Sequence, residues 1–395
     1  MAELSDFGLV VLVVAGGVIL ALLASKLSER YPVPAPALFL LAALAIPVAL
    51  PHIQTVERIG VVAVVLILFD GGMHIGWRRF RRAVVPIAVL GIVGTFTTAV
   101  VVAICAHFLL DVSWTLAGVI GAALAPTDPA VMFSILGDKE IGGNTGTILE
   151  GEAGVNDPVG IALVIGMVEF ATTDGASAWS VVQEFLLEMT IGLAVGLAGA
   201  ALLVAFSRRV DLPGEGLYPL RTLAAAGVIY GVAAVAHGSG FLAVFIAGLA
   251  LGALDIPHKR QIRRFHTSLA SLAEIVVFVA LGLTVNVDQL FDERIWLDGL
   301  LLAIALAFVA RPLALAPLLL PMRLRVGEKL FLAWSGLKGA VPILLAAFVI
   351  LAEVEDARRL YEIVFVVVLF SVVVQGSTVP FAASRLRVPM RVVGR

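Results

Sequence analysis

The sequence has little charge and almost no cysteine. Charged residues make up 14% of the 395 residues while 61% are hydrophobic, so the chain is too apolar for a soluble domain of this length. Cys105 is the single cysteine, which excludes an intramolecular disulfide and a multi-cysteine metal site. A Gly-rich phosphate loop, a metal-protease helix motif and a nucleic-acid signature are also missing, so the sequence implies no ATP, no metal cofactor and no nucleic-acid partner. This composition is typical of an integral membrane protein.

Long hydrophobic runs, divided by clusters of charge, proline and glycine, predict an all-α protein with about thirteen membrane-spanning helices. The first run has no basic residue before it and is long enough to span a bilayer, so we expect a retained helix rather than a cleaved signal peptide. The predicted spans are 8–27, 35–51, 57–75, 83–110, 114–137, 147–170, 180–206, 217–236, 239–255, 268–288, 297–320, 328–352 and 360–383.

Basic residues are distributed unevenly between the two sides of these spans. With the N-terminus outside, 21 of the 27 lysines and arginines fall inside, 4 fall outside and 2 lie within spans. Positive residues are enriched on the cytoplasmic side of membrane proteins. We therefore expect a multi-pass protein of the cell membrane with its N-terminus outside and its C-terminus in the cytoplasm. The clusters 78–82 and 259–264 are interpreted as topology signals that also contact lipid headgroups.

Helix breakers interrupt two of the predicted spans, the fifth and the twelfth. Residues 125–129 contain prolines on both sides of Asp128, and residues 335–342 contain glycines on both sides of Lys338, followed by Pro342. Both runs should break a helix inside the membrane. Asp128 would then face positive helix N-termini and Lys338 negative helix C-termini.

The positions of the two breaks indicate internal symmetry. If residues 8–170 and 217–383 are two inverted six-helix repeats joined by the helix 180–206, the breaks occupy equivalent positions. Paired broken helices in two halves are the best sequence indication of a transporter binding site at the midplane. We predict a single transporter domain over residues 1–395, without a soluble regulatory domain.

Acidic residues lie in the middle of the sixth span. Glu152 and Asn156 are four residues apart and share a helix face, and Asp157 lies about 100° round from Asn156. An ionisable residue inside a membrane is a functional-site hypothesis by default, because a charge there costs about 2.5–3.5 kcal/mol. The intramembrane ionisable residues are Asp70, Asp128, Glu152, Asp157, Glu274, Arg311 and Lys338.

Pairing of these charges leaves one acid over. We expect Glu152 and Arg311 to form an ion pair, which leaves Asp157 with only Asn156 and the carbonyls of the break loops. A buried carboxylate of this kind is neutralised by a proton or by a small cation, but not by both at once. If the carrier moves only when the site is neutral, proton and cation exchange one for one. An amide at Asn156, where an acid would bind an extra proton, favours electroneutral exchange.

Four motifs in the expected order resemble the monovalent cation/proton antiporters of the NhaP and NHE branch, over nearly the whole chain. They are Phe69-Asp70-Gly71-Gly72, Pro126-Thr127-Asp128-Pro129, Glu152-Ala153-Gly154-Val155-Asn156-Asp157-Pro158 and Gly336-Leu337-Lys338-Gly339-Ala340-Val341-Pro342.

The resemblance implies a thirteen-helix fold of two inverted repeats, usually a homodimer, in which a core domain moves against a dimerisation domain. It implies that Asp157 carries the cation and the proton and that Thr127 helps to coordinate the transported Na⁺ or K⁺. It also implies that Asn156 marks the electroneutral branch and that Glu152 pairs with Arg311.

This sequence departs from the family pattern at three positions. Many relatives have Glu where Asp70 stands and Arg where Lys338 stands, and Ala153 replaces a serine that supplies a hydroxyl in some members. The Phe-Asp-Gly-Gly form is similar to bacterial potassium/proton members. The expected function is thus exchange of Na⁺ or K⁺ for H⁺ by alternating access, with Asp157, Asn156, Thr127 and Asp128 as the candidate cation and proton site.

Other interpretations were weighed for these residues and for the whole protein. Asp70 is either an additional site residue or a helix-end residue, and Glu274 is interpreted as a satisfied interhelical partner rather than a ligand. Four histidines, His74, His237, His258 and His266, are placed at span ends. An intramembrane aspartyl protease needs two acids acting together, and the sequence has no Gly-X-Gly-Asp-type run. A cation channel does not account for the paired breaks. A sodium-coupled symporter of an organic solute remains the alternative function.

Overall fold

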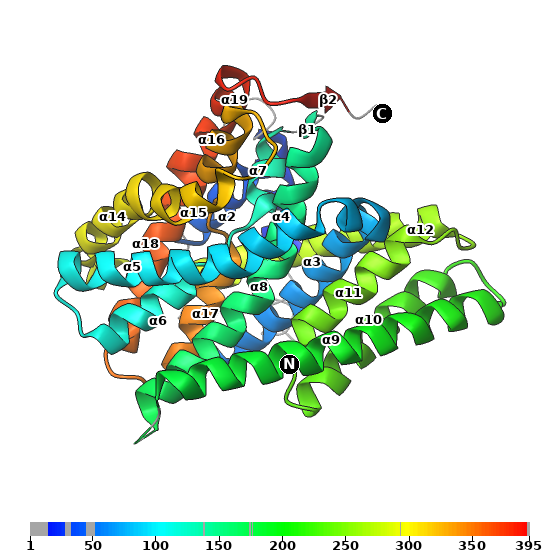
Figure 1. Cartoon of the computed structure of the whole chain (residues 1–395), viewed down its shortest axis with the longest axis horizontal. Helices are drawn as coiled ribbons and strands as arrows, with labels where there is room; N and C mark the ends of the chain where they lie inside the picture. The colour runs from blue at the N-terminus through cyan, green and yellow to red at the C-terminus, as the bar shows by residue number, and fades with distance from the viewer. Residues whose placement is uncertain are drawn as a thin grey trace, which may run out of the picture.

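The computed structural model describes residues 15–27, 33–44, 52–136, 139–173, 175, 177–292 and 294–392. Among these residues, eight helices are long and apolar enough to cross a membrane, and each overlaps a predicted span (Figure 1). They are α3 (Ile53–Arg82), α4–η1–α5 (Val84–Leu110), α8 (Gly143–Thr172), α9 (Ala178–Arg209), α10 (Leu217–Val235), α12 (Lys259–Gly282), α14–η2–α15 (Ile295–Leu319) and α18–η3–α19 (Ala357–Arg385).

Shorter helices overlap the other predicted spans. Residues 8–14 and 45–51 of the first two spans lie outside the described residues. The shorter helices are Ala15–Leu27, α2 (Ala35–Leu44), α6 (Trp114–Leu124), α7 (Pro129–Leu136), α11 (Gly240–Ala253), α13 (Val287–Asp292), α16 (Val326–Trp334) and α17 (Ala340–Leu351).

Both predicted helix breaks are present. The chain leaves helical geometry between α6 and α7 and again between α16 and α17, and the Asp128 N–H donates to the Leu337 carbonyl at 2.8 Å, which joins the two breaks directly. Figure 1 shows α8 running through the middle of the bundle, with α6 and α17 beside its lower part and α7 and α16 near its upper part. The crossing of the two broken helices therefore lies against α8.

Three long helices contain a π-helical segment, which the sequence analysis did not predict. These segments are η1 (Val89–Gly94), η2 (Leu306–Ala310) and η3 (Ser371–Gln375). π-helical turns inside α-helices are rare and occur frequently at functional sites. Segment η1 packs against α8, the helix that contains η2 packs against α16, and the helix that contains η3 packs against α17.

Close approach of α3 and α11 depends on glycine. A Cβ atom on Gly72 would lie 2.6 Å from the Phe245 carbonyl oxygen of α11, so the two backbones are almost in contact. Small residues permit such packing between membrane helices, where van der Waals contact is a main source of stability. Gly76 has φ +66°, a left-handed conformation that glycine adopts without strain, and it interrupts α3 after its membrane-spanning part.

The structure corrects the predicted boundaries of one span. The span 268–288 is wrong at both ends, because α12 begins at Lys259 and ends at Gly282, and a separate short helix α13 follows. The basic cluster 259–264, interpreted above as a topology signal, forms the first turns of this helix and lies outside the predicted span. His266 consequently lies within α12, with 1% of its surface exposed, and not at a span end as predicted.

A small sheet corrects the prediction of an all-α chain. Strand β1 (Lys139–Ile141) pairs antiparallel with strand β2 (Met390–Val392), and Glu140 lies opposite Arg391. The two side chains also form an ion pair at 2.6 Å. Three-residue strands carry no usable hydrophobic period, so the sequence pattern did not indicate them.

Candidate functional site at the helix crossing

The charges of the two break loops face helix ends of opposite sign. Lys338 Nζ donates to the carbonyl oxygens of Ala125 at 3.0 Å and Pro126 at 2.8 Å, at the C-terminal end of α6. The Asp128 side chain lies against Gly339, the residue just before α17, so closely that a Cβ there would overlap its carboxylate. The partial charges of helix ends favour this placement of a base and an acid.

Glu152 and Arg311 form a buried ion pair, as expected from the sequence. Arg311 Nη2 donates to Glu152 Oε1 at 2.9 Å, and 3% of each side chain is exposed. Arg311 Nε also donates to the Ala333 carbonyl at 3.2 Å, next to the C-terminal end of α16. The guanidinium therefore connects α8 to one half of the second broken helix.

Asn156 connects α8 to the first broken helix. Its Nδ2 donates to Thr127 Oγ1 at 2.7 Å, and its Oδ1 accepts from the Thr127 N–H at 3.4 Å. Both side chains are buried, with 1% of Asn156 and 6% of Thr127 exposed. The amide thus fixes the position of the break loop through both of its polar atoms.

Asp157 lies next to this connection, but one of its oxygens has no hydrogen bond. The side chain is 7% exposed, and Oδ1 lacks a hydrogen-bond partner among the described residues. Asp128 and Lys338 are the charged groups that interact with it electrostatically. A buried acceptor without a donor is costly, so this oxygen is suited to bind a proton or a small cation.

The sequence analysis underestimated Glu274. We expected a hydrogen-bonded interhelical partner, but Glu274 Oε1 is buried and has no hydrogen-bond partner in the described part of the chain. This carboxylate interacts electrostatically with Asp128 across the crossing. Its position in an apolar stretch of α12 was the signal, and it was noted without a functional assignment.

Asp70 has described contacts away from the break loops. Its Oδ2 lies 3.3 Å from His74 Nδ1, and its Oδ1 accepts from Thr267 Oγ1 at 3.2 Å. The Asp70 side chain is thus held between α3 and α12, near the end of the membrane-spanning part of α3.

Two polar residues of η3, Ser371 and Gln375, hydrogen-bond to the second broken helix, and the sequence pattern did not predict these contacts. The Ser371 hydroxyl accepts from the Lys338 N–H at 2.8 Å and donates to Gln375 Oε1 at 3.1 Å. Gln375 Nε2 in turn donates to the Trp334 carbonyl at 2.6 Å, at the end of α16. Two polar residues four apart in an apolar run were the available signal.

Comparison with known proteins identifies the family. The family described as sodium/hydrogen exchanger, transmembrane, matches residues 17–385. The chain belongs to this family. It is therefore a multi-pass membrane protein of a transporter family and not an enzyme.

Curated relatives of this exchanger are named as antiporters. The chain is 36% identical over 387 residues to "K(+)/H(+) antiporter NhaP" of Alkalimonas amylolytica, which covers 96% of this chain and 67% of the relative. It is 33% identical over 331 residues to "K(+)/H(+) antiporter NhaP2" of Shewanella oneidensis, covering 83% and 57%. The Na(+)/H(+) antiporter ApNhaP of Aphanothece halophytica is 26% identical over 339 residues, covering 81% and 63%. The chain thus spans about two thirds or less of the length of these relatives.

The fold of this exchanger matches a solved structure. The sodium proton antiporter MjNhaP1 from Methanocaldococcus jannaschii at pH 8 has a TM-score of 0.81 to this chain, with 22% sequence identity and 100% of both chains covered. This likeness extends over the full length of the membrane bundle. At this identity it establishes the architecture of the exchanger, and the chemistry of the site is argued from its own residues.

Proposed function

We propose that this exchanger moves K⁺ or Na⁺ across the membrane in exchange for H⁺, and that Asp157 binds the two ions in turn. The curated relatives named as K⁺/H⁺ and Na⁺/H⁺ antiporters support both cations. Exchange proceeds by alternating access, in which the helix crossing opens to one side of the membrane at a time. Thr127, Asn156 and Asp128 complete the proposed cation site.

The observation that carries this proposal is the hydrogen-bond inventory of the crossing. The Glu152 charge is compensated by Arg311, and Lys338 is occupied by two carbonyl oxygens. Asn156 uses both polar atoms on Thr127. Asp157 and Glu274 each keep a buried oxygen without a donor in the described part of the chain, and Asp157 is the one that lies on α8 directly beside Asn156 and the first break loop, so we assign the exchange of ions to Asp157.

The same inventory supports a one-for-one, electroneutral cycle. A cation neutralises Asp157 on one crossing of the membrane and a proton neutralises it on the return, so the mobile part carries the same net charge both ways. The neighbour of Asp157 is the amide of Asn156, which adds no second titrating group. The Glu152–Arg311 pair is neutral within itself and stays so in both directions.

We further propose that the chain crosses the membrane thirteen times and consists of two inverted six-helix repeats, 8–170 and 217–383, joined by α9. Two features recur at equivalent positions in these halves. The fifth and twelfth spans are both broken, and the fourth and eleventh both contain a π-helical segment, η1 and η2. This recurrence supports a duplicated unit in which the site forms between the repeats.

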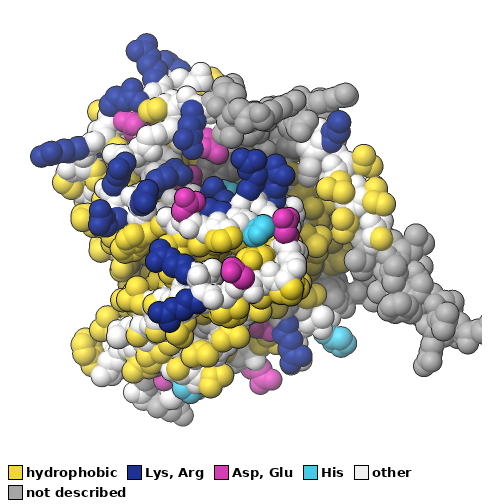
Figure 2. Space-filling model, turned by 90° about the vertical axis from the view of Figure 1, so that its right-hand side faces the viewer, with side chains coloured by type: hydrophobic (Ala, Val, Ile, Leu, Met, Phe, Trp, Pro, Cys, Tyr) yellow, Lys and Arg dark blue, Asp and Glu magenta, His cyan; other side chains and the backbone are white. Residues whose placement is uncertain are grey.

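The proposed orientation has the N-terminus outside and the C-terminus in the cytoplasm. Figure 2 shows Lys and Arg side chains gathered over the upper part of one face, in agreement with the basic bias of the predicted inside loops. We also propose a homodimer in which α9 faces the second copy. The position of α9 at the edge of the bundle supports this, because 22% of its apolar stretch is buried, the smallest share among the eight long helices of the described residues.

Proteoliposomes with an imposed pH gradient test the function. We expect K⁺ or Na⁺ to collapse the gradient at a rate that an imposed membrane potential does not change. Asp157→Asn should abolish the response, because a neutral amide takes up no proton near neutral pH and supplies no negative charge to balance a bound cation. Glu188→Gln, at another buried acid on α9, should retain it. Full exchange by Asp157→Asn would overturn the proposal, and ion flux that requires an organic solute would establish the symporter instead.

A further inference from the structure

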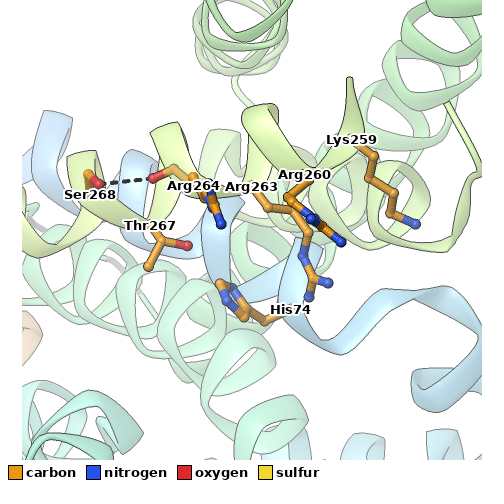
Figure 3. A pocket seen from close by; sticks show the side chains of 7 residues that line it. All are labelled: His74, Lys259, Arg260, Arg263, Arg264, Thr267 and Ser268. Carbon is orange, nitrogen blue, oxygen red and sulfur yellow. Dashed lines mark hydrogen bonds between the residues drawn. The ribbon is translucent and has the colours of Figure 1, made fainter. Parts of the chain in front are cut away.

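A cavity lies away from the helix crossing, where α3 faces the beginning of α12. It has a volume of about 730 Å³, within the range of about 300–1,000 Å³ that is typical of small-molecule sites. Arg260, Arg263, Arg264, Thr267 and Ser268 line it from α12 and His74 lines it from α3 (Figure 3). Spacings of three and four residues place these α12 side chains along neighbouring faces of one helix.

The cavity is lined by basic and neutral side chains only. Within the described part of the chain, Arg260, Arg263 and Arg264 form no ion pair, so no carboxylate in direct contact compensates their charges. Figure 3 shows the Arg263 guanidinium directed toward His74, and the two groups interact electrostatically. Three cations held around one hollow repel one another, and a bound anion would relieve this repulsion.

The available donors favour a phosphate group. Lys259, the fourth cation of the cavity, donates to the carbonyl oxygens of Gly252 and Leu254. The Ser268 hydroxyl donates to the Arg264 carbonyl. The three guanidinium groups are therefore the donors left for a ligand, and guanidinium binds phosphate oxygens through two parallel hydrogen bonds.

Two side chains that line the cavity contact Asp70, a candidate site residue. Two lining side chains, His74 and Thr267, hold the two carboxylate oxygens of Asp70, at 3.3 and 3.2 Å. An anion drawn toward Arg263 also meets His74, so its binding changes the surroundings of Asp70. The cavity is thus connected to the membrane-spanning part of α3 through two direct contacts.

We propose that this cavity binds a phosphate-bearing anion, either a lipid headgroup or a soluble phosphate ester, and that the exchanger senses the bound anion at Asp70. Binding itself is independent of the proposed function, whereas the effect on exchange rests on it. The basic cluster 259–264 then serves as a ligand site in addition to a topology signal.

Binding is tested with the full chain in phosphatidylcholine nanodiscs, titrated with pyrophosphate in a calorimeter. We expect saturable binding that weakens as salt is raised. The triple variant Arg260→Gln/Arg263→Gln/Arg264→Gln should bind pyrophosphate at least about tenfold more weakly than the wild type. The matched control Arg208→Gln/Arg209→Gln/Arg385→Gln removes the same charge from exposed positions elsewhere and should bind like the wild type. If the triple variant elutes as aggregate, Arg264→Gln alone replaces it.

A second arm distinguishes the two sources of phosphate. Phosphatidylglycerol added to the nanodiscs should raise the thermal midpoint of the wild type and of the control but not of the triple variant, if the ligand is a headgroup. If the ligand is a soluble phosphate ester, pyrophosphate should raise the thermal midpoint of the wild type and of the control, but not of the triple variant, in nanodiscs of phosphatidylcholine alone. Either pattern supports the phosphate site. Equal responses of the wild type and the triple variant to both probes would overturn it.

The effect on exchange is tested in proteoliposomes. Pyrophosphate on the side of the cavity should change the cation KM of the wild type about threefold and leave that of the triple variant unchanged. Binding without any change in KM or rate would overturn the connection to Asp70. Failure of exchange in the wild type, with binding intact, would instead count against the proposed function.

Discussion

Arg311 Nη2 lies 2.9 Å from Glu152 Oε1, with 3% of each side chain exposed. Breaking such a pair from one side leaves an uncompensated buried charge, which costs about 3–5 kcal/mol. We therefore expect Arg311→Ala and Glu152→Gln to lower the thermal midpoint of the protein in detergent more than they change cation selectivity. Arg359→Ala is the control, because its pair with Asp298 is 39% and 26% exposed and should contribute about 0–1 kcal/mol. Wild-type midpoints for both Glu152 and Arg311 variants would contradict this account.

Asn156→Asp tests the role of the amide. The substitution removes the Nδ2 donor to Thr127 and adds an acid beside Asp157. We expect exchange to slow about tenfold, because the break loop loses its fixed position. Thr127→Val removes the same hydrogen bond without adding charge and should slow exchange to a similar degree. Fast, potential-driven exchange by Asn156→Asp would show that the amide alone sets the stoichiometry.

Lys338→Met tests the stabilisation of the break loops. The ammonium group holds the carbonyls of Ala125 and Pro126, and hydrogen bonds from a charged donor contribute about 1.5–3 kcal/mol each. We expect the free energy of unfolding to fall by about 3 kcal/mol, measured by denaturant titration in detergent. Lys329→Met removes a similar bond to the Leu320 carbonyl at an exposed position and should cost less than about 1 kcal/mol. Equal losses in the two variants would refute the argument from burial.

Glu274→Gln separates stability from function. An amide removes the negative charge from a buried side chain that has an unpaired oxygen, so the thermal midpoint should stay the same or rise, equivalent to about 1 kcal/mol. Because Glu274 faces Asp128 electrostatically, we expect the cation KM to change about threefold or more. A lower midpoint together with an unchanged KM would show that Glu274 is an interhelical packing partner, as the sequence suggested, and has no role in cation binding.

Gly339→Ala tests the close approach at the crossing. A methyl group there would overlap the Asp128 carboxylate, which must then move. We expect exchange to fall about tenfold or more, since small displacements of a binding group have large kinetic effects. Gly231→Ala, where no atom lies within 4 Å of the added methyl, should be active and slightly more stable. Wild-type exchange by Gly339→Ala would mean that Asp128 can move without consequence.

The helix breaks and the buried pair could be predicted because their residues have few alternatives. Two prolines within four residues around Asp128 strongly disfavour a continuous α-helix, and a charge at Glu152 inside a membrane needs a partner. Arg311 and Lys338 are the only lysine or arginine residues near the middle of the predicted spans, so Arg311 was one of two possible partners for Glu152. Local chemistry alone determined these features.

The π-helical segments and the start of α12 could not be predicted in the same way. Residues 306–310 are ordinary helix formers, and the wider turn that they adopt depends on packing against neighbouring helices. In α12, the basic residues 259–264 continue the helix beyond the apolar stretch, where hydropathy gives no signal. Contacts such as Ser371 with the Lys338 N–H depend on the folded arrangement of distant segments.

The pairing of β1 with β2 makes two segments far apart in the chain move as one body. Glu140 and Arg391, 251 positions apart, are joined by an ion pair, and the Gly142 N–H donates to the Pro389 carbonyl at 2.7 Å. Strand β1 belongs to the linker between α7 and α8, so it follows the first broken helix directly. A mechanical load applied to the segment after α19 is therefore transmitted to the linker that joins the first broken helix to α8, without passing through the rest of the bundle.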